Sequence, residues 1–144
     1  MVMNQNVELL NFIYQNAEMG VITIKQLLDI VKDEDFCRHL KSQLEEYEQI
    51  HSKARDLLEK HGFDEKGIGT FEKLRTYLMI NMQTLTDKTP SHIAEMMIIG
   101  SNMGIIDAVK NINHYADAES DLISLMKKLL QVEENNVQQL KKFL

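Results

Sequence analysis

A chain of 144 residues with a net charge of −6 fits one domain, residues 1–144, and can bury a sizeable core. Hydrophobic residues make up 44% of it and charged residues 26%, a balance typical of soluble globular proteins rather than of disordered chains. An acidic surface without a large basic cluster repels phosphate backbones, so nucleic acid is excluded as an expected partner.

The single cysteine, Cys37, excludes an internal disulfide and a thiolate-rich zinc site. The N-terminus lacks the cationic stretch and apolar block of a secretory signal. Apolar runs are far shorter than the roughly 20 residues that span a bilayer. We therefore expect no membrane insertion and a location in a reducing cytoplasm.

Few prolines and glycines favour long helices. Apolar residues at three- and four-residue spacing predict a first helix over residues 7–31 and a second over 35–61. Asp33 is the expected N-cap of the second helix. Gly62 is its expected C′ residue, in the left-handed conformation.

A connector of about 28 residues follows, and a short helix is predicted within it over residues 70–85. Thr89 and Pro90 read as an N-cap and a first helical residue, beginning a long third helix that ends near residue 115. Asp117 is the expected N-cap of the fourth. Short loops within each helix pair and a long connector between pairs predict an all-α four-helix bundle of two hairpins joined by a crossover. The alternative is an up-down bundle with the fifth helix on its side.

Four polar residues stand near the middle of the inward-facing stripes, one on each long helix. They are Asn16, His51, Ser101 and Glu133. Stacked in a bundle, they would form one polar layer in an apolar core. Such a layer holds either a metal cluster or a hydrogen-bond network that fixes helix register.

Glu48 and His51 form a Glu-x-x-His motif, one helical turn apart, so that a carboxylate and an imidazole can address the same metal ion. With this motif the chain resembles the ferritin-like superfamily, as a small bacterial member. Di-metal members of that superfamily carry one Glu on each of two helices and a Glu-x-x-His on each of the other two.

The resemblance implies a ligand set that this sequence fills in part. Glu48, His51 and Glu133 match, whereas Asn136 stands where the second His belongs. Asn16 and Ser101 stand where two glutamates belong. We therefore expect no stoichiometric iron or manganese and no other cofactor.

Each of the three matching residues also has a structural interpretation. Glu48, at the edge of its stripe, reads as a surface or boundary carboxylate. His51 reads as a buried histidine satisfied by a partner. Glu133 faces the core and needs a partner or must become neutral, and His51 is the predicted partner.

The third helix is apolar on two sides. Its second apolar stripe consists of Met96, Ile99, Met103 and Ile106. Either the connector helix covers this stripe or a second copy of the chain does, and methionines suit an adaptable contact surface. The favoured function is a non-catalytic structural or protein-interaction bundle that forms a homodimer. The alternatives are a metal-binding or di-metal redox protein, and an organic ligand bound between the methionine-rich helices.

Overall fold

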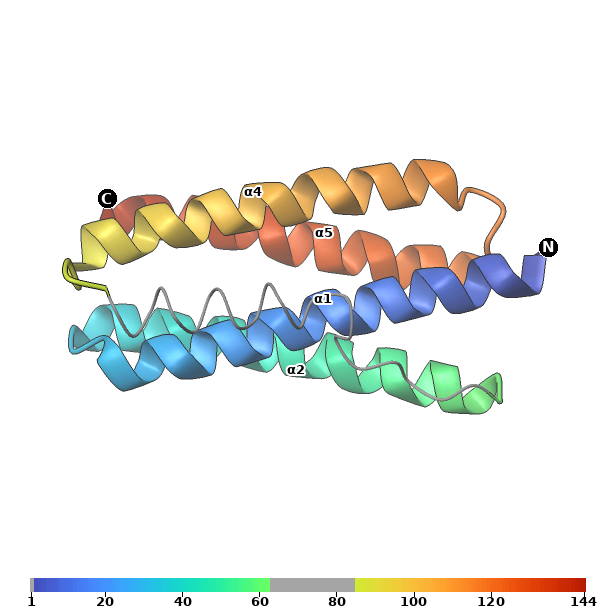
Figure 1. Ribbon diagram of the computed structural model, residues 1–144, viewed down its shortest axis with the longest axis horizontal. Helices are drawn as coiled ribbons and strands as arrows, with labels where there is room; N and C mark the ends of the chain where they lie inside the picture. Colours follow the sequence, from blue (N-terminus) through green and yellow to red (C-terminus); the bar gives the residue numbers. More distant parts are fainter. Residues whose placement is uncertain (1, 63–84) are drawn as a thin grey trace.

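The computed structural model describes residues 2–62 and 85–144, and throughout these residues the fold is all-α. The helices are α1 (Val2–Ile30), α2 (Glu34–Lys60), α4 (Pro90–His114) and α5 (Ser120–Leu140), and a 3-10 turn, η2 (Lys141–Phe143), ends the chain. Two antiparallel hairpins, α1–α2 and α4–α5, lie one above the other (Figure 1). The prediction of an all-α helical bundle is confirmed. The helix predicted over residues 70–85 lies, except for its last residue, outside the described residues.

Local sequence signals place three of the helix ends. The Asp33 side chain accepts a 2.8 Å hydrogen bond from the Phe36 backbone N–H, as an N-cap of α2 does. Thr89 caps α4 in the same way, through His92 N–H at 3.3 Å. After α2, Gly62 takes the left-handed conformation with φ of 79°. All three assignments confirm the sequence-based predictions.

The start of α5 differs from its prediction. Asp117 does not cap this helix, because α5 begins at Ser120 after Glu119, which makes no side-chain capping bond. The Glu119 backbone N–H instead donates a 3.0 Å hydrogen bond to Oδ1 of Asn6 on α1. A residue far away in the sequence thus satisfies a backbone donor at this helix start.

The directions of the helices follow from contacts at the two ends of the bundle. Between α2 and α5, His61 Nε2 lies 3.7 Å from a Glu119 carboxylate oxygen at one end. At the other end the rings of Phe36 and Phe143 stand 4.6 Å apart, edge to face. The two helices are therefore antiparallel, whereas α2 and α4 run in the same direction and α4 begins at the end opposite to where α2 finishes (Figure 1).

The helices bury different kinds of residue. Helices α1, α2 and α5 place large side chains in the core. Fully buried examples are Leu9, Ile13, Leu27, Phe36, Leu58 and Met126. Along α4 only Ile93, Ala94 and Ala108 are buried. The small residues of α4 let it lie close to the bundle, and much of its apolar side-chain surface faces solvent.

Candidate functional site

A buried polar cluster joins the two hairpins at mid-length. The hydroxyl of Tyr47 on α2 donates a 2.7 Å hydrogen bond to Oε1 of Glu133 on α5. The side-chain amide of Asn136, one turn further along α5, donates to the same hydroxyl at 3.4 Å. All three side chains are buried, and Glu133 is only 8% exposed. These two hydrogen bonds join α2 to the middle of α5.

A glycine on α1 makes room for the Tyr47 ring. A Cβ atom placed on Gly20 would stand 2.7 Å from Cδ1 of Tyr47 and 2.8 Å from Cγ, closer than real contacts allow. The ring therefore lies directly on the α1 backbone. No larger residue fits at Gly20 unless Tyr47 moves, so this glycine helps to aim the hydroxyl at Glu133.

On the other side, α4 presents small residues to Glu133. A Cβ on Gly104 would stand 3.5 Å from the Glu133 carboxyl carbon, an ordinary contact distance. Ser101, one turn earlier and half-buried, acts on the carboxylate as a neighbouring hydroxyl. No hydrogen bond of ordinary geometry, however, reaches the buried Oε2 of Glu133 from the described residues.

Burial dominates the electrostatics of the cluster. It raises the pKa of the Glu133 carboxyl, because the charged form loses water, while the hydroxyls of Tyr47 and Ser101 oppose the rise. Burial also raises the pKa of Tyr47 well above its ordinary value, and the adjacent Glu133 carboxylate adds to the increase. Tyr47 therefore stays a neutral donor, and the free energy of this site depends on the protonation of Glu133.

The other members of the predicted polar layer have different surroundings. Asn16 is half-buried, and its side-chain amide donates a 2.9 Å hydrogen bond to the backbone carbonyl of Phe12 in its own helix. The imidazole of His51 is half-buried and stacks on the ring of Tyr14, with centroids 4.2 Å apart. Of the four predicted residues, the structure brings Ser101 and Glu133 together at the buried cluster.

The register of α2 against α5 explains why Tyr47 meets Glu133. Tyr47 pairs with Glu133, and His61 pairs with Glu119, 14 residues along each helix in opposite directions. By the same register His51 is level with Leu129, about 6 Å along the axis from Glu133 at 1.5 Å per residue. The sequence predicts His51 as the partner of Glu133, whereas the hydrogen-bonding partner is Tyr47, one turn away along α2.

The predicted metal ligands are spread over different surroundings. Glu48 lies on the exposed side of α2, whereas Glu133 is buried. Within residues 2–62 and 85–144, no group of three or more His, Cys, Asp or Glu side chains is arranged to hold a metal ion.

Sequence reasoning missed Tyr47 and Asn136 as members of the cluster. Tyr47 lay in the apolar stripe of its helix, and its hydroxyl was the available signal, because a buried tyrosine usually finds a hydrogen-bond partner. Asn136 lay one turn from Glu133 on the same face. Gly20 gave a further signal, since a glycine within an apolar stripe leaves room for a large neighbour.

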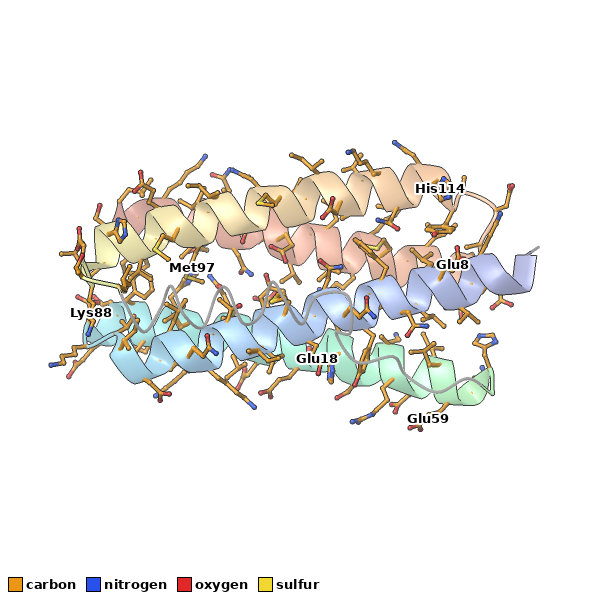
Figure 2. The ribbon with its side chains drawn as sticks, in the orientation of Figure 1. Glu8, Glu18, Glu59, Lys88, Met97 and His114 are labelled. Atoms are coloured by element: carbon orange, nitrogen blue, oxygen red, sulfur yellow. The ribbon has the colours of Figure 1, made fainter. Side chains whose placement is uncertain are left out.

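The second predicted feature, the apolar stripe of α4, lies largely at the surface. Ile99 is 59% exposed, Met103 60% and Ile106 55%, while Met96 is half-buried. Val109 extends the exposed apolar surface toward the end of the helix. Figure 2 shows Met97 on the other side of α4, toward the α1–α2 hairpin, where it packs against the core. We call Met96, Ile99, Met103 and Ile106 the α4 outer stripe.

An organic ligand between the methionine-rich helices would need a cavity lined by methionines. A cavity of about 260 Å³ lies between α1 and the end of α4. Its lining residues are Val7, Glu8, Asn11, Phe12, Gln15, Asn111 and Tyr115. None is a methionine, and a 2.9 Å hydrogen bond from the Tyr115 hydroxyl to Glu8 joins its two sides. The cavity is therefore not the one that the methionine-rich helices suggested.

Comparison with known proteins gives no relative for this chain: no protein-family model, no curated protein and no solved structure matches it. None of the described helices combines the length and apolar character needed to cross a membrane.

Proposed function

We propose that the protein is a non-catalytic interaction bundle that works as a homodimer, with the α4 outer stripe as its contact surface. The observation that carries this proposal is the exposure of Ile99, Met103 and Ile106 on consecutive turns of one helix. A row of large apolar side chains in water is uncommon on monomeric proteins and typical of protein interfaces. The ferritin-like arrangement is part of the proposal, and the parallel directions of α2 and α4 support it.

In this proposal the buried cluster has a structural role. Tyr47 and Glu133 fix the relative height of the two hairpins, because their 2.7 Å hydrogen bond forms in one register only. An apolar core of similar shape would tolerate sliding by a turn. The polar pair thus gives the bundle a defined outer surface, which an interaction module needs.

The charge-introducing variant Ile99→Glu tests the proposal. Because Ile99 is mostly exposed in the single chain, the variant should fold normally. The Kd of the dimer should rise by at least about 30-fold, the effect expected when a residue at the centre of an interface is changed. Gln138→Glu adds the same charge on an exposed face of α5 and is the matched control. Sedimentation equilibrium measures both. A wild-type chain that stays monomeric at about 100 μM, or an Ile99→Glu variant that still dimerises, would refute the proposal.

A metal-dependent redox function is the competing hypothesis, and one observation favours it. Glu133 is a carboxylate buried at mid-bundle, with one oxygen that no ordinary hydrogen bond reaches from the described residues. Elemental analysis of protein purified without chelators decides between the two. We expect no stoichiometric iron or manganese. One divalent ion per chain, with Glu48, His51 and Glu133 as ligands, would replace our proposal.

A further inference from the structure

The α4 outer stripe has the spacing of a coiled-coil seam. Met96, Ile99, Met103 and Ile106 follow one another at intervals of three, four and three residues. This alternation keeps apolar side chains along one line when two helices pack lengthwise at a small angle. Lys110, four residues after Ile106 and exposed, occupies the next position of the same line. The apolar seam therefore ends in a positive charge.

The two ways of pairing a helix with its copy treat that charge differently. In a parallel pair each seam residue faces the same residue of the other copy, so the two Lys110 side chains meet at the seam and repel each other. In an antiparallel pair the layers join different residues. Met96 then faces Ile106, Ile99 faces Met103, and Lys110 is level with His92 of the second copy. That position is one turn from Glu95.

We propose that two copies of the chain pair through α4 in antiparallel orientation, in the register that places Met96 against Ile106 and Lys110 beside Glu95 of the second copy. This inference rests on the proposed homodimer and specifies how the two copies meet. The twofold axis passes near residue 101, so each contact occurs twice.

Charge and backbone on either side of the seam favour this register. Glu95 is exposed and lies 3.7 Å from His92 on its own helix, which keeps its carboxylate near the seam. Gly100 is exposed, and no heavy atom of the described chain outside its own helix comes within 4 Å of where its Cβ would be. In the antiparallel register the two Gly100 residues meet near the axis, where missing side chains let the helices approach closely.

Single-cysteine chains test the orientation directly. Met96→Cys and Ile106→Cys are each made in a Cys37→Ser background, so that one thiol remains per chain. In the antiparallel register each introduced cysteine is about 15 Å along the axis from its own copy but faces the other position. A disulfide needs Cα atoms within about 7 Å. Oxidation should therefore cross-link the mixture of the two chains and leave each chain alone uncross-linked.

The outcomes separate this inference from the proposed function. Cross-linking of each chain alone would show a parallel pair and overturn the orientation while leaving the homodimer intact. A wild-type dimer that gives no cross-link in the mixture would overturn the register. A wild-type monomer would remove the proposed function itself.

Charge exchange provides a second readout. Lys110→Glu should weaken the dimer by about 10-fold at low salt, because it places a carboxylate next to the Glu95 carboxylate at each of the two symmetry-related contacts. Adding Glu95→Lys to the same chain should restore the affinity, since the pair is then reversed. In a parallel dimer Lys110→Glu only exchanges one like-charged pair for another, and Glu95→Lys restores nothing. An unchanged Kd for Lys110→Glu would contradict the antiparallel register.

Discussion

Each hairpin has a glycine at mid-length that faces a member of the buried cluster, but the space beside the two glycines differs. In the α1–α2 hairpin Gly20 faces Tyr47, and in the α4–α5 hairpin Gly104 faces Glu133. A Cβ at Gly20 would press against the tyrosine ring at 2.7 Å, whereas a Cβ at Gly104 would meet the carboxyl carbon at 3.5 Å. The tyrosine ring is thus packed tightly against the α1 backbone, whereas a methyl group would fit beside the carboxylate. The pair combines a closely packed donor with an acceptor that has room on its α4 side.

The largest expected effect on stability comes from removing the Tyr47 hydroxyl, which donates to Glu133. Tyr47→Phe should lower the free energy of unfolding by about 1.5–3 kcal/mol near neutral pH, because it strands a buried carboxylate. Tyr115→Phe is the matched control, since that hydroxyl donates to an exposed Glu8, and it should change stability by no more than about 0.5 kcal/mol. Urea denaturation at one fixed protein concentration measures both. Equal effects at the two tyrosines would mean that the buried bond adds nothing.

The next effect tests the difference between the two glycines. Gly20→Ala should destabilise the protein by up to about 2 kcal/mol, because a steric cost of about 1–3 kcal/mol is offset by a gain of about 1 kcal/mol in helix propensity. Gly104→Ala should be neutral or stabilise by up to about 1 kcal/mol, since its Cβ has ordinary contacts. Thermal unfolding of the two variants gives the comparison. A stabilised Gly20→Ala variant would show that Tyr47 is not held against α1.

The smallest effect concerns the protonation of Glu133. Because burial raises its folded-state pKa above the ordinary value of 4.5, the carboxyl favours folding below about pH 4.5, and this contribution is lost as pH rises through the folded-state pKa. Glu133→Gln cannot titrate. The wild type should therefore lose stability relative to Glu133→Gln with rising pH, by at most about 1.4 kcal/mol per pH unit. A wild type that gains relative stability would show that the hydroxyl donors outweigh burial.

Sequence reasoning reached what is local. The Asp33 and Thr89 caps, the left-handed Gly62 and the inward position of Glu133 each depend on a few neighbouring residues or on helical period. Helical period shows which face a residue occupies but not its height relative to another helix. The sequence predicts His51 as the partner of Glu133, and the structure has Tyr47 in that place. The difference is one helical turn in the height of α2 relative to α5.

Long-range contacts account for the other differences. The start of α5 was misplaced because its backbone donor is satisfied by Asn6 on α1, which no pattern near Asp117 indicates. Gly20 indicated room for a large neighbour, but the sequence could not show that Tyr47 fills it, since that depends on how closely two helices approach. The exposed α4 outer stripe, by contrast, was visible in the sequence as a second apolar side of this helix.

The hydrogen bond from the Glu119 backbone N–H to Asn6 links one amide proton at the start of α5 to the contact between the two hairpins. Ordinarily the first amides of a helix exchange with solvent quickly, because they have no intrahelical acceptor. Here one of them is held by α1, 113 residues away in sequence. Its hydrogen-exchange rate therefore reports on whether the two hairpins are docked, separately from whether α5 is helical. An opening that parts the hairpins but leaves each intact would be seen first at this single amide.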